Sequence, residues 1–313
     1  MATYLVTGGA GFIGSHIVEE LVERGEYVRV LDNFSTGKME NIKHLAEEIE
    51  IITGDIRDSH ALTIAMSGID YVLHQAALPS VPRSIENPLE CNAVNVNGTL
   101  NVLCAARDYG VKRVIYAGSS SAYGNIAISP KHEELAPSPA SPYAVSKLTG
   151  EYYCKVFYEV YGLETVTLRY FNVFGPRQDP DSPYSAVIPI FARRMFNNQA
   201  PLIHGDGEQT RDFTYVRNNA LANILACTAN GVEGKVYNIA CGSSLSLREL
   251  VEKMNLILGT AIEPEYGSER EGDVKHSCAD ISRAREEIGY RPETTFEEGL
   301  AETLAYFSEQ YSD

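Results

Sequence analysis

A tyrosine and a lysine four residues apart are the first candidates for chemistry in this chain. Tyr143 and Lys147 follow Ser141 and Pro142, and a proline in the first turn of a helix would put both side chains on one helix face. A nearby ammonium favours the ionised phenol, so Lys147 would lower the pKa of Tyr143 from about 10 toward working pH. Tyr143 is therefore a candidate general base and acid. Taken alone, the spacing usually marks a solvated helix face.

Three consecutive serines form a second candidate group. Ser119, Ser120 and Ser121 follow an apolar run at 114–117 that is typical of a buried strand. In a parallel sheet they would lie at the carboxyl edge, where ligands bind in this architecture. Their hydroxyls could hold a substrate oxygen, or some of them could make only local turn hydrogen bonds.

A glycine-rich turn predicts a dinucleotide site. Gly9, Gly11 and Gly14 satisfy the G-x-G-x-x-G pattern between the first apolar run and the first helical pattern, with Gly8 before them. Bare backbone at a helix N-terminus can approach a pyrophosphate. Asp32 ends the second apolar run, where a carboxylate binds a ribose 2′-hydroxyl and repels a 2′-phosphate, which favours NAD over NADP. The alternative is a plain strand–helix turn with Asp32 capping a loop.

The elements that must position these groups alternate along the first half of the chain. Short apolar runs predict strands at 4–7, 28–31, 49–53, 71–74, 114–117 and 165–170. Longer stretches between them carry apolar residues at helical spacing, as Ile13, Ile17 and Leu21 do. Continuously apolar strands that alternate with helices predict an α/β fold of the Rossmann type, a doubly wound parallel sheet covered on both faces.

The regular alternation of apolar runs and helical patterns ends after about residue 175. Five prolines between 176 and 201 break the chain into loops and short elements. A helix should start at the capping box of Ser246 and Glu249 and end at Gly259, and capped helices should follow at 280–289 and 295–306. We expect an NAD-binding domain at 1–175, rejoined by about 213–242, and a smaller α/β substrate lobe from 176–212 and 243–313.

Composition excludes several classes of protein. The 313 residues are 44% apolar and 22% charged, which supports a sizeable core. With 26 Lys and Arg against 42 Asp and Glu, the net charge of −16 argues against nucleic-acid and anionic-membrane partners. No run is long enough to span a membrane, and the N-terminus lacks a signal-peptide pattern. Scattered cysteines and histidines favour reduced thiols, a cytoplasmic location and no metal site.

Taken together, the motifs resemble the extended short-chain dehydrogenases/reductases and, within them, the UDP-hexose 4-epimerases. The resemblance runs nearly end to end. It rests on the glycine turn, the serines, the Tyr143–Lys147 pair and the segments 32–33, 54–56, 74–77, 95–99, 169–177, 211–213 and 270–273.

The resemblance implies roles for individual residues. Ser119, four residues before the tyrosine of Tyr123-Gly124, would be the catalytic hydroxyl beside Tyr143 and Lys147, with Ser120 a close second. The implied NAD contacts are Gly8, Gly11, Phe12, Ile13, Gly14, Asp32, Asn33, Ser35, Gly37, Asp55, Ile56, Gln75, Ala76, Ala77, Tyr143, Lys147 and Tyr170.

A UDP-sugar substrate is implied in the same way. The implied substrate contacts are Ser80, Arg83, Ser119, Ser121, Tyr143, Asn172, Val187, Arg211, Arg270, Asp273 and Ser277. Two guanidiniums and an amide, from Arg211, Arg270 and Asn172, would form a diphosphate clamp. Either arginine could instead pair only with a neighbouring carboxylate.

The reaction follows from what stands beside the catalytic hydroxyl. Family members first oxidise the sugar at C4. Dehydratases and decarboxylases of the family carry an acid two residues before the tyrosine of Tyr-Gly, where this chain has Ser121 after Ser120. The resemblance therefore implies an NAD-dependent 4-epimerase, an isomerase with a transient 4-keto sugar. A dehydratase or decarboxylase, and a non-catalytic NAD-binding protein, remain the alternatives.

The sugar is indicated by one small residue. Four residues after Asp273, glucose-restricted epimerases often have Tyr, whereas this chain has Ser277, which leaves room for a 2-acetamido group. UDP-GlcNAc and UDP-GalNAc are the expected pair, with UDP-glucose and UDP-galactose also accommodated. A UDP-glucose-restricted 4-epimerase remains an alternative. Asp179 stands where glucuronate epimerases tend to have Arg, which disfavours UDP-glucuronate without excluding it. The family also implies a homodimer, through helices near 100–109 and 143–161.

Overall fold

The computed structural model of the protein describes residues 1–179, 186–269 and 275–311. Two predicted substrate residues, Arg270 and Asp273, lie outside these described residues.

A seven-stranded sheet forms the centre of the fold, in the order β11-β6-β5-β4-β1-β2-β3. All neighbouring strands are parallel. The strands are β1 (Thr3–Thr7), β2 (Tyr27–Asp32), β3 (Ile49–Thr53), β4 (Tyr71–His74), β5 (Arg113–Ser119), β6 (Glu164–Tyr170) and β11 (Lys235–Ile239). The predicted Rossmann-type sheet is confirmed, and the six predicted strands all lie in it. Because the order reverses at β1, the ends of β1 and β4 form a topological switch point, where ligands bind in such sheets.

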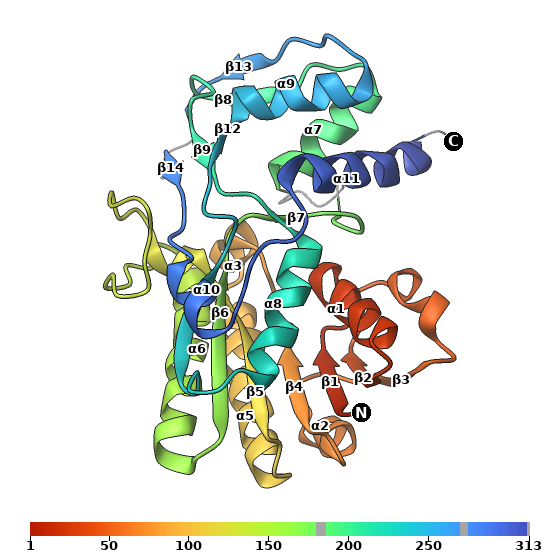
Figure 1. Ribbon diagram of the computed structural model, residues 1–313, viewed down its shortest axis with the longest axis vertical. Coiled ribbons are helices and arrows are strands. Elements are labelled where there is room, and N and C mark those ends of the chain that lie inside the picture. The colour runs from red at the N-terminus through yellow and green to blue at the C-terminus, as the bar shows by residue number, and fades with distance from the viewer. Residues whose placement is uncertain (180–185, 270–274, 312–313) are drawn as a thin grey trace.

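Helices cover both faces of this sheet (Figure 1). One face is packed by α1 (Phe12–Glu23) and α8 (Val216–Thr228), with Ile17 and Ala222 fully buried in one core cluster. The other is packed by α2 (Ser59–Met66), α5 (Thr99–Asp108) and α6 (Pro142–Tyr161), around Val102 and Phe157. Two short helices, α3 (Val81–Glu86) and α4 (Pro88–Asn92), continue through a π-helical segment (Ala93–Gly98) into α5. Short 3-10 turns lie at Met39–Asn41, Lys43–Leu45 and Ser120–Tyr123.

A smaller lobe stands beyond the carboxyl ends of the strands (Figure 1). Its helices are α7 (Val187–Phe196), α9 (Leu247–Leu258) and α11 (Phe296–Tyr311), which share a separate apolar core. Three small sheets complete it. Their strands are β7 (Val173–Phe174) with β10 (Thr214–Tyr215), β8 (Leu202–His204) with β13 (Glu265–Gly267), and β12 (Leu245–Ser246), β9 (Thr210–Arg211) and β14 (His276–Ser277).

The predicted helix ends of this lobe can be compared with the structure. The capping box of Ser246 and Glu249 opens α9, and left-handed Gly259 closes it, as predicted. Helix α11 runs five residues further than expected, to Tyr311. The helix expected from Asp280 is the shorter α10 (Ser282–Glu287), because Ile281 occupies the N-cap and Asp280 only accepts a hydrogen bond from the Ser282 N–H at 2.8 Å.

The division of the chain into two lobes remains a proposal, and the core clusters are compatible with it. Strand β11 and helix α8, from the predicted returning segment, belong to the first lobe. The structure adds one refinement. Ile281, Ala284, Ile288 and Tyr290 are buried in the core of the first lobe, so the chain returns to it a second time around α10.

Candidate active site

The glycine turn connects β1 to α1 by an unusually close backbone packing. Gly8 has a φ of +69°, and a Cβ on Gly14 would lie 2.1 Å from the Gly8 carbonyl oxygen. No side chain caps α1 at its N-cap residue, Gly11. The first-turn N–H groups therefore face outward at the positive end of a helix dipole, which is a binding site for an anion.

Asp32 ends β2 beside this turn. Its carboxylate accepts hydrogen bonds from the Ala10 N–H at 3.0 Å and the Phe34 N–H at 2.8 Å. Burial raises the pKa of Asp32, and these backbone bonds oppose the rise. A Cβ on Gly37 would come within 2.9 Å of the same carboxylate, so glycine is required there. Asp32 is thus held where the sequence predicts a ribose partner.

Two further predicted cofactor residues bind each other across the next strand end. The Asn33 amide donates to the Asp55 carboxylate at 2.8 Å, and the Arg57 guanidinium holds the pKa of Asp55 well below its usual range. The Ser35 N–H donates to Asn33 at 3.0 Å. Ile56 is buried against Gly98. These contacts shape a wall at the ends of β2 and β3.

The turn after β4 lies directly against the glycine turn. A Cβ on Gly8 would be 2.7 Å from the Ala76 nitrogen, so only glycine permits this approach. Gln75 is engaged in a closed set of hydrogen bonds: Tyr170 O–H donates to it at 3.2 Å, and it donates to Asn223 at 3.1 Å, which in turn donates to Tyr170 at 2.7 Å. Gln75 and Tyr170 therefore link the strand ends, and Ala77 follows in the same turn.

The arrangement fits a dinucleotide. Bare backbone at the α1 N-terminus can receive a pyrophosphate, and Asp32 offers a carboxylate to a ribose diol. Phe12 and Ile13 stand in the first turn of α1, partly buried against the core of the second lobe. The glycine turn thus lies between the two lobes.

Helix α6 brings the predicted acid–base pair to the adjacent strand ends. The Ser141 hydroxyl accepts from the Ala144 N–H at 3.1 Å, and Pro142 stands in the first turn, as predicted. Lys147 donates from Nζ to the Ala117 carbonyl at 2.9 Å. Burial lowers the pKa of Lys147 to about 8, because a buried ammonium loses its hydration.

Tyr143 lies beside Ser119, the hydroxyl that the resemblance implied. Burial raises the pKa of Tyr143, and a hydrogen bond with Ser119 opposes the rise. This differs from the lowered pKa expected from Lys147: desolvation of the phenolate is the largest contribution, and the contribution that opposes it comes from Ser119 and not from Lys147. A cationic nicotinamide ring would supply charge of the opposite sign to the phenolate.

Among the three serines, geometry favours Ser119. Ser119 caps the short 3-10 turn, and its Oγ accepts from both the backbone N–H and the hydroxyl of Ser121, at 3.2 and 2.8 Å. Ser120 is the first residue of that turn. Ser121 therefore orients the Ser119 hydroxyl.

Two residues that received no role from the sequence hold the backbone of Tyr143 in place. Ser84 does so directly, and Asn95 does so through Ser146, whose hydroxyl donates to the Tyr143 carbonyl at 2.8 Å. The Tyr143 N–H donates to the Ser84 hydroxyl at 3.0 Å, and Ser84 donates to the Val81 carbonyl at 2.6 Å. Asn95, in the π-helical segment, bonds both the N–H and the C=O of Leu78 and donates to Ser146 at 3.0 Å. The segment containing Asn95 was part of the resemblance, but nothing local to Ser84 signals a partner 59 positions away.

His74 links the cofactor turn to this region through a directional chain. The Thr99 hydroxyl donates to the Asn95 carbonyl at 2.6 Å, so it accepts from His74 Nε2–H at 3.0 Å. His74 Nδ1 then accepts from the Thr7 hydroxyl at 2.7 Å, and Thr7 accepts from the Ala76 N–H at 3.3 Å. Burial lowers the pKa of His74 to about 3, and the neutral ring satisfies every partner.

The predicted substrate residues fall on both lobes. Ser80 caps α3, and Arg83 faces Glu90 at 3.4 Å. Val187 opens α7 and is half-buried. Asn172 adopts a φ of +34° and donates to the Asp212 carbonyl at 3.0 Å. Arg211 and Ser277 are paired in register on β9 and β14.

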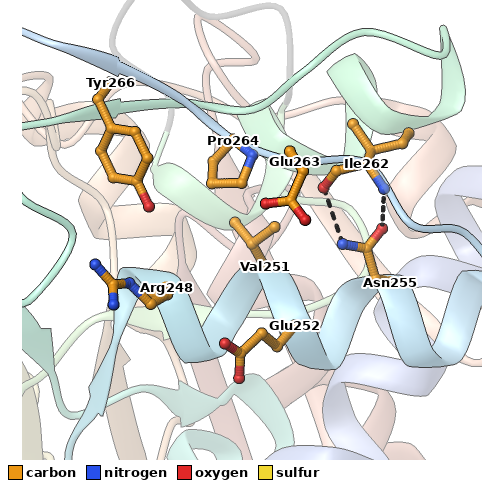
Figure 2. A pocket seen from close by; sticks show the side chains of 8 residues that line it. All are labelled: Arg248, Val251, Glu252, Asn255, Ile262, Glu263, Pro264 and Tyr266. Atoms are coloured by element: carbon orange, nitrogen blue, oxygen red, sulfur yellow. Dashed lines mark hydrogen bonds between the residues drawn. The ribbon is translucent and has the colours of Figure 1, made fainter.

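A hollow of about 300 Å³ lies elsewhere, between α9 and β13 (Figure 2). Arg248, Glu252 and Tyr266 are among the residues that line it. Two hydrogen bonds between the Asn255 side chain and the backbone of Ile262, at 3.0 and 2.9 Å, connect α9 to the segment before β13. It contains none of the predicted site residues. The candidate active site is therefore defined by the strand ends and not by this hollow.

Comparison with known proteins agrees with the geometry. Residues 4–240 match the "NAD dependent epimerase/dehydratase family". A solved UDP-N-acetylglucosamine 4-epimerase from Methanobrevibacter ruminantium M1, in complex with UDP-N-acetylmuramic acid, is 45% identical over 99% of both chains, with a TM-score of 0.95. The Thermus thermophilus UDP-glucose 4-epimerase, solved with NAD, is 38% identical over 98% of this chain and 99% of that one, with a TM-score of 0.87.

A curated relative supports the same assignment. The UDP-glucose 4-epimerase of Mycolicibacterium smegmatis is 37% identical over 97% of both chains. The chain belongs to the NAD-dependent epimerase/dehydratase family, and it is an NAD-dependent isomerase of the 4-epimerase type. In the part of the chain that the structure describes, no helix has the length and apolarity needed to cross a membrane.

The neutral state of His74 predicts acid sensitivity of the fold. Its pKa is near 6.5 in an unfolded chain and about 3 in the fold, so its stabilising contribution is present above pH 6.5 and is lost as the pH falls toward 3. Between pH 7.5 and 5.0 the loss is about 2 kcal/mol for this one residue. The measurement is the free energy of unfolding in urea at pH 7.5 and at pH 5.0. Its decrease between these two pH values should be about 2 kcal/mol smaller in His74→Gln than in the wild type.

The matched control is His60→Gln, on the exposed first turn of α2. The free energy of unfolding of this variant should change between the two pH values by as much as that of the wild type. An unchanged difference in His74→Gln would show that His74 is not held neutral.

Proposed function

We propose that this protein interconverts the C4 epimers of UDP-N-acetylhexosamines, UDP-GlcNAc and UDP-GalNAc, and also accepts UDP-glucose and UDP-galactose. The observation that carries the proposal is the contact between the side chains of Ser119 and Tyr143 at the strand ends, next to the dinucleotide turn. A donor hydroxyl and a phenol at one sugar oxygen are what a reversible oxidation at C4 requires.

The side chains at this site would transfer the proton of the sugar 4-hydroxyl. Ser119, oriented by Ser121, would bind the sugar 4-oxygen and carry its proton to Tyr143. The Lys147 ammonium would stabilise the tyrosinate. NAD supplies the acceptor that takes the C4 hydride and returns it. The 4-keto sugar must then turn over within the site so that C4 receives the hydride on its opposite face, while Tyr143 returns the proton to the 4-oxygen.

The surroundings of Ser119 support epimerisation over elimination. The next two positions are Ser120 and Ser121, and neither hydroxyl can serve as a carboxylic acid that delivers a proton to a leaving group. A dehydratase or decarboxylase side activity is therefore disfavoured. A 4-keto-6-deoxy product or release of carbon dioxide would identify it.

The substrate lobe would hold the nucleotide diphosphate. The Asn172 amide donates to the carbonyl of Asp212, and Arg211 directly precedes Asp212 in the chain. A guanidinium and an amide are suitable donors to phosphate oxygens. Arg270 and Asp273 are proposed for the diphosphate and a ribose on the resemblance alone.

The N-acetylated sugar is proposed from Ser277. Its small side chain stands in register with Arg211 on the neighbouring strand, where it leaves volume for a 2-acetamido group. The similarity to a UDP-N-acetylglucosamine 4-epimerase supports the same sugar. Asp179, which pairs with Lys38 at 3.8 Å, stands at the position where the resemblance puts an arginine in glucuronate epimerases, so this position offers no positive charge to a uronate.

We further propose a homodimer formed through α5 and α6. Helix α6 exposes large apolar side chains along much of its length, with Val145, Tyr152, Val156 and Val160 between 44% and 65% exposed. Covering such a stripe removes apolar area from water.

The proposed activity predicts the products of a substrate panel. Incubation with UDP-GlcNAc should give UDP-GalNAc, resolved by anion-exchange chromatography, with no net change in NAD. Tyr143→Phe should lower turnover by at least about 10²-fold because it removes the proton acceptor, while it keeps NAD bound. Tyr158→Phe, at the exposed end of the same helix, is the control. No conversion of UDP-GlcNAc or UDP-glucose at high enzyme concentration would overturn the proposal.

Sugar selectivity should depend on residue 277. Ser277→Tyr fills the proposed acetamido space, so kcat/KM should fall at least about tenfold more for UDP-GlcNAc than for UDP-glucose. His276→Tyr is the control, because neighbouring residues of a strand face opposite sides. Equal losses for both substrates in Ser277→Tyr would remove Ser277 from sugar selection.

The proposed dimer should dissociate when a charged residue replaces one of the exposed apolar residues of α6. Sedimentation velocity should give twice the mass of the 34.4 kDa chain for wild type and the chain mass for Val156→Asp. Leu256→Asp, at an 83% exposed position of α9, should remain a dimer. A monomeric wild type would contradict the proposed dimer.

A further inference from the structure

Asp212 lies at the point where the small three-stranded sheet meets the first lobe. It directly follows Arg211 at the end of β9. Strand β12 pairs antiparallel with β9, and β14 pairs parallel with it, so the start of β12 and the end of β14 come to the same edge. All three strands therefore connect to the rest of the fold beside Asp212.

The Asp212 carboxylate holds these connections together. It is fully buried, and it accepts hydrogen bonds from three backbone N–H groups, those of Cys241 at 2.9 Å, Gly242 at 3.1 Å and Ala279 at 3.1 Å. The first two follow β11, and the third follows β14 by two residues. Burial raises the pKa of Asp212 to about 6, whereas the three backbone bonds oppose the rise.

The backbone of the same residue reaches the loop after β6. Its carbonyl accepts from the Asn172 amide at 3.0 Å, and the Thr214 N–H donates to the Asn172 carbonyl at 3.2 Å. Asn172 has a φ of +34°, a conformation that costs a non-glycine residue free energy and needs support from its surroundings. Asp212 thus contacts the segments that carry three of the proposed substrate residues, Asn172, Arg211 and Ser277.

We infer that Asp212 is a positioning residue for substrate: it fixes Asn172, Arg211 and Ser277 in one geometry and sets the affinity for the nucleotide diphosphate without touching it. The inference rests on the proposed function. It assigns Asp212 no part in proton or hydride transfer, because its carboxylate is committed to backbone donors.

The substitution Asp212→Asn tests this role with nearly the same side-chain shape. One oxygen can still accept from Cys241, but the new NH2 group would face the Gly242 and Ala279 N–H donors. We expect KM for the UDP-sugar and Kd for UDP, the latter by calorimetry, to rise at least about tenfold. We expect kcat to stay within about threefold of wild type, and NAD content to be unchanged.

Asn218→Ser is the matched control. Asn218 is equally buried, and its oxygen accepts from the Glu293 and Thr294 N–H groups at 2.9 and 3.1 Å, away from the substrate residues. It should lower the melting temperature but leave KM and the UDP affinity unchanged. Wild-type KM in Asp212→Asn, or a loss of kcat alone, would overturn the inference. A wild-type protein that neither binds UDP nor converts a UDP-sugar would instead overturn the proposed function, and the inference with it.

Hydrogen exchange on the wild-type protein gives a second test that does not require the variant to fold. If Asp212 couples the substrate residues to the first lobe, UDP must strengthen its contacts in return. Saturating UDP should slow exchange of the Cys241, Gly242 and Ala279 amides at least about tenfold, and leave the Glu293 and Thr294 amides unaffected. Unchanged rates at the first three amides would refute the coupling.

Discussion

The close approach of two backbone turns at the centre of the sheet is the constraint on which the rest of the structure depends. Gly8 and Ala76 follow the adjacent strands β1 and β4, and a Cβ on Gly8 would be only 2.7 Å from the Ala76 nitrogen. This contact is possible only because the strand order reverses at β1 and because residue 8 has no side chain. It places the open N-terminus of α1 at the same edge of the sheet as the ends of β4 and β5, where Tyr143 and Ser119 lie.

Burial of polar groups is the second feature shared by the site. Three polar side chains, those of Lys147, His74 and Asp212, are nearly inaccessible to solvent. Burial shifts the pKa of each in the direction that favours its neutral form. Each is satisfied by fixed partners: a carbonyl for Lys147, two hydroxyls for His74 and three N–H groups for Asp212. Such fixed partners need little reorganisation, so these three buried groups keep their geometry.

The net charge of −16 is consistent with anionic ligands once the site is considered separately from the surface. The ligands expected for this chain, NAD and a UDP-sugar, would meet a helix N-terminus, Arg211 and an amide. The acidic excess can then be carried by the outer surface, where it favours solubility. The hydrogen bonds of Asp212 tie the small sheet of the second lobe to the residues after β11 of the first, which relates the diphosphate residues to the cofactor turn.

The sequence by itself determined the parallel sheet, the glycine turn, Asp32 and the Tyr143–Lys147 face, because each depends on residues that are close together in the chain and follow a strand or helix period. It also determined the capping box of α9 and, through family resemblance, it favoured Ser119 among the three serines, with Ser120 a close second. Three features were decided by tertiary structure alone. The Ser84 hydroxyl accepts from the Tyr143 N–H, and α10 packs in the core of the first lobe. The Asp212 carboxylate accepts from the N–H groups of Cys241, Gly242 and Ala279. The direction of the Tyr143 pKa shift was also a tertiary result, since the desolvation that outweighs the Ser119 contact depends on how the whole chain packs around the phenol.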